Sequence, residues 1–322
     1  MAVVRARTAR GILAGVGKTL GTHADGTTVR ARGGSSCENR DDVRLPARRQ
    51  TRLLSLQPSD LSETACLSLQ SHPMKKIVKS VFRRLGLDVR YFTISRSPEL
   101  QLTTALKIAA VDTVFDIGAN TGQFGAGIRS AGYRGRIVSF EPLSSARREL
   151  IMTRNGDERW TIHDQVALGS RSGYVDLNIA GNSVSSSILP MLDSHKSASV
   201  ASSYVGVERV PIMRLDDIAD MYVDAGSSIF VKVDTQGYEW EVFDGAEVTL
   251  ARARGVLCEL SLIPLYDGQR LYRDVIARLE SLGYRLWAIQ EAFSDPRTGQ
   301  MLQLDAIFMK DFMVRGCEGV SS

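Results

Sequence analysis

The residues best suited to chemistry lie in a glycine-containing loop, FDIGANTGQF, at residues 115–124. The loop directly follows an apolar strand and begins a helix. Glycines at positions 118 and 122 let the backbone turn tightly and approach a ligand without a clash from Cβ. A dinucleotide-binding loop of the GxGxxG type, started at Gly118, would need two further glycines at positions that are Asn120 and Gln123. The loop is therefore a poor cradle for a pyrophosphate.

Two carboxylates follow the first two strands of this region. Asp116 lies at the end of the strand before the loop, where its charge would repel phosphate but suit a ligand with an ammonium or sulfonium group. Glu141 ends the next strand, in the segment IVSFEP, 23 residues after Gly118. This separation is close to the about 20 residues at which an acid bonds ribose hydroxyls in nucleotide-binding α/β folds. We therefore predict that Glu141 binds a ribose; the alternative is an exposed carboxylate at a strand end.

A third group of chemical residues lies in the segment IFVKVDTQGYEWE at residues 229–241. Its apolar strand delivers Asp234 to the edge of the sheet where open α/β folds bind their ligands. Glu239 begins a helix, where it could equally complement the positive end of the helix dipole. Lys232, inside the apolar run, could pair with a neighbouring carboxylate. Glu259, in the following strand, could converge on the same crevice.

The distribution of charge argues against nucleic acid as a substrate. The 322-residue chain has a formal net charge of +4. Residues 1–73 contain 11 Lys or Arg against 6 Asp or Glu, and the remainder contains 29 against 30. A nucleic-acid enzyme normally carries its basic surface on the folded domain, whereas this main body is close to neutral. No apolar run approaches the about 20 residues that a transmembrane helix needs.

Strands and helices are expected to alternate along the main body. Continuous apolar runs fit strands that are buried on both faces of a parallel sheet. The predicted strands are 113–117, 136–140, 160–163, 229–233, 256–260, 284–289 and 304–309. The predicted helices are 121–131, 144–153, 238–252 and 271–282, and another begins at Ser97–Pro98–Glu99. Such alternation predicts an α/β fold with a doubly wound sheet, which the short strand-like pieces of residues 166–211 interrupt.

The first 73 residues differ in composition from the rest. They are rich in Arg, Gly, Ser and Thr without sustained periodicity, which indicates disorder or a leader that is not native. They could also be a targeting tail or bind an anionic surface, and translation could begin at Met74. Residues 74–85 predict an amphipathic basic helix, packed on the domain or, alternatively, lying on a membrane surface. The expected parts are residues 1–73, N-terminal helices at 74–110, a main domain at 111–312 and a tail at 313–322.

Taken in order, these motifs resemble the FkbM family of S-adenosylmethionine-dependent methyltransferases over about residues 111–310. The resemblance also uses VALG at 166–169, the serines at 185–187, LDD at 215–217, DGA at 244–246, CE at 258–259, GY at 283–284, and Asp305 with Phe308. It implies a class I methyltransferase fold, a Rossmann-like doubly wound sheet of seven strands that is mostly parallel with one antiparallel strand. It also implies S-adenosylmethionine as the cofactor. The cofactor contacts that it implies are Asp116, Gly118, Asn120, Gly122, Glu141 and, near the adenine, the backbone of Ala167.

Methyl transfer from a sulfonium to an alcohol needs a group that accepts the alcohol's proton, because an alcohol is a poor nucleophile. Asp234 is the first candidate for this base, followed by Glu239 and by His163, which ends the third strand. Each has a structural alternative: loop-anchoring hydrogen bonds for Asp234, helix capping for Glu239 and surface exposure for His163. A divalent metal is a further alternative if Asp234 and Glu259 converge, because hard cations take carboxylate oxygens.

The resemblance implies O-methylation of a hydroxyl on a small molecule, a sugar, a glycolipid or a polyketide-like product. The serines at 185–187, with Asn182, could line a polar pocket for this acceptor or form a flexible linker. Four scattered cysteines suit a reducing cytoplasm. A glycolipid acceptor would give the basic helix at 74–85 a purpose at the inner face of the membrane.

Other functions stay open from the sequence. A binding or assembly protein could use a methyltransferase scaffold without catalysis. A nucleotide-dependent oxidoreductase shares the fold class, but it would need the third glycine that Gln123 replaces. A nucleic-acid methyltransferase is disfavoured, because the main body is not basic and lacks an Asn-Pro-Pro-aromatic motif.

Overall fold

The computed structural model describes residues 2–5, 80–82, 84, 88–91 and 93–310. It divides into two units, Met1–Tyr91 and Phe92–Ser322. In the first unit, β1 (Ala2–Arg5) pairs antiparallel with β2 (Asp88–Tyr91). Of the predicted helix at 74–85, residues 80–82 and 84 are described and helical, and the rest lies outside the described residues. The remainder of the leader and the tail at 313–322 also lie outside them.

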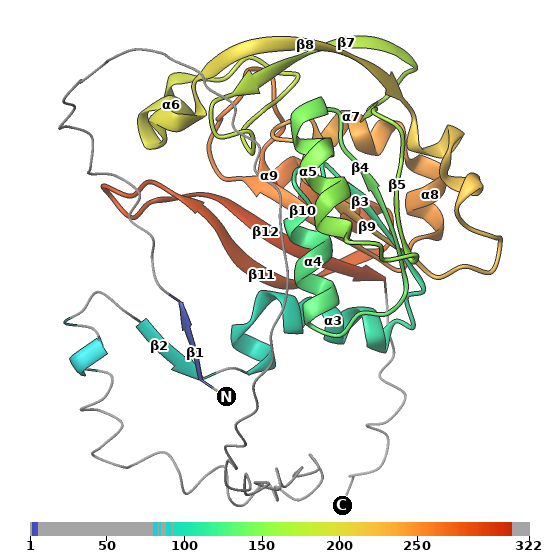
Figure 1. Cartoon of the computed structure of the whole chain (residues 1–322), viewed down its shortest axis with the longest axis horizontal. Helices are drawn as coiled ribbons and strands as arrows, with labels where there is room; N and C mark the ends of the chain where they lie inside the picture. The colour runs from blue at the N-terminus through green and yellow to red at the C-terminus, as the bar shows by residue number, and fades with distance from the viewer. Residues whose placement is uncertain (1, 6–79, 83, 85–87, 92, 311–322) are drawn as a thin grey trace, which may run out of the picture. The chain divides into compact units, whose positions relative to one another are not determined.

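A seven-stranded sheet forms the centre of the second unit (Figure 1). Its strands are β3 (Thr113–Ile117), β4 (Arg136–Phe140), β5 (Trp160–Ile162), β9 (Ile229–Val233), β10 (Gly255–Ser261), β11 (Tyr284–Ser294) and β12 (Met301–Lys310). Their order across the sheet is β11-β12-β10-β9-β3-β4-β5. Neighbours from β10 to β5 run parallel, and β12 is antiparallel to both β10 and β11. The prediction of a doubly wound sheet with one antiparallel strand is confirmed.

Helices cover both faces of this sheet because successive strand residues point to opposite sides. The helices are α3 (Pro98–Ile108), α4 (Gln123–Ser130), α5 (Ser144–Arg154), α7 (Glu239–Asp244), α8 (Glu247–Arg252) and α9 (Tyr272–Ser281). On one face Val114 and Phe230 pack with α3, α4 and α5, while on the other Phe115 and Val231 pack with α7, α8 and α9. Both sets are fully buried, as continuous apolar strands predict. Among the described helices, none combines the length and apolar character needed to cross a membrane.

The helix predicted over 238–252 is two helices, α7 and α8, with Gly245 between them. A Cβ on Gly245 would lie 1.9 Å from the carbonyl oxygen of Gly169, so the backbones meet too closely for a side chain. The Gly245 carbonyl also accepts a hydrogen bond from the amide of Asp216 (3.0 Å) instead of continuing a helix. The tertiary contact of Gly245 therefore overrides local helix propensity.

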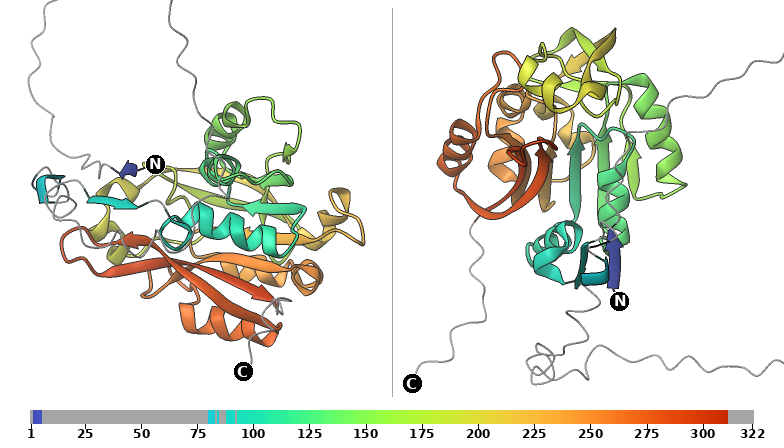
Figure 2. Two further views of the ribbon diagram at one scale, coloured as in Figure 1. Left: turned by 90° about the horizontal axis from the view of Figure 1, so that it is seen from below. Right: turned by 90° about the vertical axis from the view of Figure 1, so that its left-hand side faces the viewer.

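Residues 166–213 form an insertion, which explains why the strand–helix alternation stops there. It contains β6 (Ala167–Leu168), β7 (Gly173–Ala180), α6 (Asp193–Ala198) and β8 (Tyr204–Met213). The three strands make a second sheet in the order β6-β8-β7, and Leu177 and Ile212 pack on Leu143 and Ala146 at the start of α5. These yellow-green elements gather at one end of the central sheet (Figure 2).

Candidate active site

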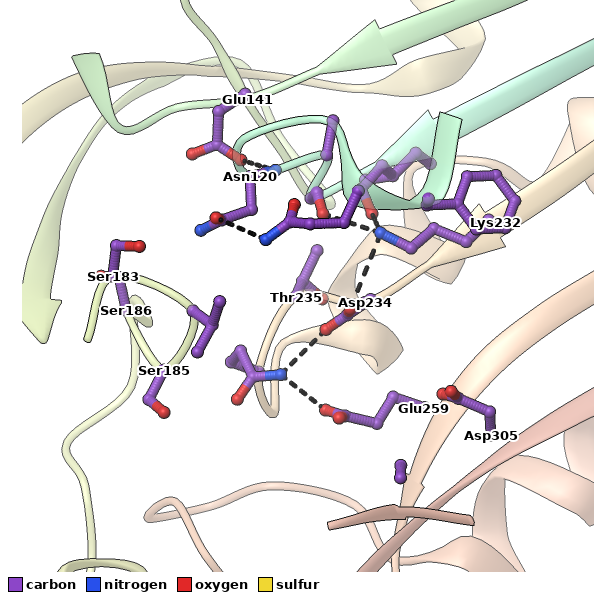
Figure 3. A pocket seen from close by; sticks show the side chains of 18 of the residues that line it. Asn120, Glu141, Ser183, Ser185, Ser186, Lys232, Asp234, Thr235, Glu259 and Asp305 are labelled. Carbon is purple, nitrogen blue, oxygen red and sulfur yellow. Dashed lines mark hydrogen bonds and ion pairs between the residues drawn. The ribbon is translucent and has the colours of Figure 1, made fainter. Parts of the chain in front are cut away.

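A cavity of about 550 Å³ lies where the carboxyl ends of β3, β4, β9 and β10 face the insertion. Its wall contains the glycine loop after β3, the start of the segment after β4 and the turn after β9. The insertion adds Asn182 through Ser186, and the β11–β12 hairpin adds Gln303 and Asp305. Figure 3 shows the polar side chains of these elements around a common space. The strand-end location is the one predicted for a ligand in a doubly wound sheet.

The glycine loop turns through backbone conformations that favour glycine. Gly118 has φ +72°, and a Cβ there would lie 1.9 Å from the carbonyl oxygen of Asp234. The amides of Gly118 and Ala119 both donate to the carbonyl of Phe140, at 3.1 Å. Gly122 has φ +91° and leads the chain into α4. Gly118 and Asn120 line the cavity, whereas Gly122 shapes the turn from outside the lining residues.

Asp116 is fully buried and does not reach the cavity wall. Its carboxylate lies 3.1 Å from Lys232 Nζ and accepts a hydrogen bond from Ser139 Oγ at 3.0 Å. Lys232 also donates to the carbonyls of Ile117 (3.3 Å) and Gly118 (2.7 Å). Burial alone would lower the pKa of Lys232, but the Asp116 carboxylate and its neighbours raise it above the ordinary value. Asp116 therefore lies behind the loop and pairs with Lys232, and its predicted contact with the cofactor stays a prediction. The pairing of Lys232 with a neighbouring carboxylate, considered from the sequence, is confirmed.

Glu141 lies on the cavity wall and holds the glycine loop against the end of β4. One carboxylate oxygen accepts from the amide of Asn120 (2.7 Å) and the other from the amide of Leu143 (2.8 Å). Burial raises the pKa of Glu141 to about 7 against the lowering effect of these hydrogen bonds. Each oxygen keeps acceptor capacity for a hydroxyl. Ala167, on β6, is buried on the same wall, and the cofactor roles of these residues stay predictions.

Asp234 is the most accessible acid of the turn after β9, with 36% of its side chain exposed. One of its oxygens lies 3.6 Å from Lys232 Nζ, and the other accepts from Gln236 Nε2 at 2.8 Å. Gln236 Nε2 also donates to Glu259 (2.7 Å), and Gln236 has a positive φ of 56°. The sequence expectation that Asp234 and Glu259 converge is therefore met, through an amide that bridges them (Figure 3).

Glu239 does not line the cavity. One of its oxygens accepts from the amide of Thr235 (2.9 Å), the hydroxyl of Thr235 (3.1 Å) and the amide of Gly237 (3.1 Å). Burial raises the pKa of Glu239 to about 7. Its geometry is that of an anchor for the turn that carries Asp234, whereas the alternative considered from the sequence was helix capping.

His163 is likewise not brought to the cavity. It follows β5 and packs its ring at 5.3 Å from Phe140 and 5.9 Å from Tyr222, between ring centroids. Burial lowers the pKa of His163. The imidazole is partly buried against these two rings and is not among the residues that line the cavity.

Asp305 and Glu259 form an acidic patch on adjacent strands. They are direct partners in the antiparallel pairing of β10 and β12, and Gln303 Nε2 donates to Glu259 at 2.7 Å. Burial, then the charge of Asp234, raises the pKa of Asp305 to about 7 and that of Glu259 well above its ordinary value. Among the described residues, no group of three or more His, Cys, Asp or Glu has the arrangement to hold a metal ion.

The serine segment lines the cavity and is held by an internal network. Asn182 Nδ2 donates to Ser185 Oγ (3.0 Å) and to Ser202 Oγ (3.1 Å). Ser187 Oγ donates to the carbonyl of Gln236 at 2.7 Å. These contacts place the segment on the wall beside the turn of Asp234, which favours the polar-pocket interpretation over the flexible linker.

Sequence reasoning did not assign roles to Gln236, Gln303 or His195, although all three line the cavity. Gln236 had a usable signal, because it stands between Asp234 and a glycine that allows a turn. Gln303 alternates with apolar residues on a strand, and such a position does not reveal which face meets the cavity. His195 lies in the irregular insertion, where no periodicity located it.

The family model of the FkbM methyltransferase domain matches residues 116–286, which is more than half of the chain. The chain belongs to the FkbM methyltransferase family. The sheet order of this FkbM methyltransferase, with its antiparallel β12, is the class I methyltransferase arrangement. No curated protein matches the chain.

Three of the solved structures that are similar to this FkbM methyltransferase have low sequence identity to it. The magnesium protoporphyrin IX methyltransferase of Synechocystis PCC 6803, with bound S-adenosylmethionine, is 10% identical over 75% of this chain and 99% of that one, with a TM-score of 0.36. The TehB-like S-adenosylmethionine-dependent methyltransferase of Corynebacterium glutamicum is 13% identical over 74% and 97%, with a TM-score of 0.33. The precorrin-6y C5,15-methyltransferase of Geobacter metallireducens is 12% identical over 66% and 87%, with a TM-score of 0.36.

Proposed function

We propose that this FkbM methyltransferase transfers the methyl group of S-adenosylmethionine to a hydroxyl oxygen of a small-molecule acceptor. The observation that carries the proposal is the accessible Asp234 carboxylate, which shares one cavity with the glycine loop and Glu141. A methyl donor held at the loop would leave the acceptor hydroxyl between donor and acid. This is the arrangement that methylation of an alcohol requires.

The residues around the glycine loop fit a positively charged nucleoside better than a diphosphate. Lys232 is the only lysine or arginine among the described lining residues, and its charge is already paired with Asp116 and Asp234. Glu141 offers carboxylate oxygens to ribose hydroxyls, and the backbone of Gly118 and Asn120 approaches the cavity without large side chains. The charges therefore support S-adenosylmethionine over NAD or ATP.

S-adenosylmethionine supplies an electrophilic methyl group on a sulfonium when it is bound. Transfer of that methyl group to the acceptor oxygen would release S-adenosylhomocysteine, and Asp234 would accept the proton that the acceptor hydroxyl loses. Gln236 and Lys232 each contact one oxygen of Asp234 and fix its orientation. The serine segment and Asn182 line the cavity, where they would hold further hydroxyls of the acceptor.

The test begins with binding, measured by calorimetry on the full chain with S-adenosylhomocysteine, NAD and ATP. We expect micromolar binding of S-adenosylhomocysteine alone. Cell extracts incubated with the enzyme and methyl-tritiated S-adenosylmethionine should then yield a labelled species. The same species made with the unlabelled donor should be about 14 Da heavier than its precursor and carry the new methyl group on oxygen. Binding of NAD in preference to S-adenosylhomocysteine would refute the proposal.

The Asp234→Asn variant tests the role of the base. We expect the rate of label transfer to fall by about 10² to 10⁴, the usual contribution of general base catalysis, with S-adenosylhomocysteine binding within about threefold of wild type. Asp220→Asn is the matched control, because the Asp220 side chain is 80% exposed and does not line the cavity. Transfer by Asp234→Asn at the control rate would contradict the assignment.

A further inference from the structure

His195 is a buried titratable residue on the cavity wall that has no role in the proposed function described above. It lies on α6, only 2% of it is exposed, and it lines the cavity. Its Nδ1 has no hydrogen-bond partner within the described part of the chain. Buried polar atoms nearly always have a partner. Because the residue lines the cavity, a molecule bound there lies beside an imidazole that has a polar atom without a partner in the described part of the chain.

The ring is held firmly in this position. It packs edge-on against Tyr266, with 5.2 Å between centroids and an interplanar angle of 77°, and lies 5.4 Å from Phe293. The segment before α6 is tied to the loop after β10, because the amide of Leu192 donates to the carbonyl of Leu265 at 2.9 Å. These contacts fix the imidazole before any ligand binds.

The same contacts connect His195 to the proposed base. Tyr266, on which the imidazole packs, donates its hydroxyl to Gln236 Oε1 at 2.9 Å. Gln236 in turn donates to Asp234. The imidazole and the carboxylate are therefore linked by a continuous set of packed and hydrogen-bonded side chains.

The chemistry of the wall selects for an uncharged partner. Asp234, Glu259 and Asp305 line the cavity, and Lys232, the only lysine or arginine among the described lining residues, is paired. An anionic group would thus lie near the exposed Asp234 carboxylate without an available cation. Burial lowers the pKa of His195 to about 4, so that its imidazole is neutral near pH 7. A neutral imidazole can both accept and donate a hydrogen bond, which suits a hydroxyl.

We infer that His195 is a substrate-binding residue, which hydrogen-bonds one hydroxyl of an uncharged, polyhydroxylated acceptor while Asp234 receives the proton of another. This inference rests on the proposed function, because it takes the cavity beside the glycine loop as the acceptor site. It adds a specificity: the acceptor carries no phosphate or carboxylate beside the methylated hydroxyl.

The test uses full-length protein saturated with S-adenosylhomocysteine and titrated with methyl glycosides. The neutral probes are the methyl glycosides of glucose, mannose, galactose and rhamnose, and methyl glucuronoside is the anionic probe. Calorimetry gives the Kd of each. Three variants are compared with wild type. His195→Phe removes the hydrogen bond but keeps an aromatic ring, His195→Asn restores a polar atom near the position of Nδ1, and His163→Phe changes a histidine outside the cavity lining.

We expect wild type to bind at least one neutral glycoside and to bind the glucuronoside at least tenfold more weakly. His195→Phe should weaken the neutral glycoside at least tenfold, His195→Asn should recover part of that loss, and His163→Phe should stay within twofold of wild type. The Kd for S-adenosylhomocysteine should stay within twofold in every variant, which also shows that each one folds.

Three results would overturn the inference: neutral glycosides that bind His195→Phe as well as wild type, wild type that binds none of them, or tighter binding of the glucuronoside. Failure of the wild-type protein to bind S-adenosylhomocysteine would instead refute the proposed function, and the inference with it. Because the cofactor product and the glycosides are titrated separately, the two failures are distinguishable.

Discussion

Replacing Lys232 with methionine tests whether the buried ion pair holds the glycine loop. Lys232 is 4% exposed and Asp116 is not exposed at all, so the substitution leaves a carboxylate in the core with Ser139 as its remaining hydrogen-bond partner. Removing one member of a buried pair typically costs about 3 to 5 kcal/mol, because the other charge stays buried without compensation. We expect a loss of about that size in the free energy of unfolding.

The double variant Asp116→Asn/Lys232→Met separates the cost of an uncompensated charge from the loss of packing. Its loss in the free energy of unfolding should be smaller than the sum of the losses of the two single variants, by a coupling energy of about 1 to 3 kcal/mol. Arg252→Met is the matched control, because Arg252 pairs at 2.7 Å with an Asp220 side chain that is 80% exposed. An exposed pair contributes about 0 to 1 kcal/mol.

Urea unfolding at pH 7 provides the assay. The indole of Trp160 donates to Ser139 Oγ at 2.9 Å, next to Asp116, so its fluorescence reports on the perturbed site. The reasoning would be refuted if Lys232→Met lost less than about 1 kcal/mol, or if the double variant lost the full sum of the two single changes. Equal losses in Lys232→Met and Arg252→Met would also contradict it.

Two further predictions follow from the loop and the buried acids. Gly118→Ala should lose S-adenosylhomocysteine binding in calorimetry, because its Cβ would meet the carbonyl of Asp234 at 1.9 Å. Gly132→Ala is the control, because Gly132 has φ +103° but its added Cβ would have no heavy atom within 4 Å. This variant should bear only the backbone strain of about 1 to 2 kcal/mol and keep binding. Equal binding by both variants would exclude the clash. Burial raises the pKa of Glu141 and of Glu239 from 4.5 to about 7, so the folded state holds these protons more tightly than the unfolded state. Their contribution to stability is full below about pH 4.5 and is lost as pH rises through about 7. The urea midpoint of unfolding should therefore be lower at pH 8 than at pH 5.5. Glu239→Gln should reduce this difference between the two midpoints.

The parallel strands were predictable because burial on both faces leaves a continuous apolar signature. β3, β4 and β9 begin and end at the residues predicted from the sequence. The end of α7 was not predictable in the same way. Gly245 interrupts the helix because its backbone meets Gly169, a contact between residues far apart in the chain.

In the candidate site too, local sequence located some residues, while contacts between distant residues determined the orientation of others. Local sequence placed Gly118, Asn120 and Glu141 at the cavity, because each lies directly after a recognisable strand. Whether an acid at a strand end faces the cavity or the core depends on its partner across the sheet. Asp116 turns inward to a lysine that lies 116 residues further along the chain, and no local pattern contains that information.

The hydroxyl of Ser187 donates to the carbonyl of Gln236, so the serine segment that lines the proposed acceptor cavity is held to the residue whose side chain donates to Asp234. Replacing the serine segment would therefore also disturb Gln236 and, through it, Asp234. Efforts to redirect this protein to a new acceptor by grafting a different insertion should therefore retain a donor at position 187, or turnover will suffer together with selectivity.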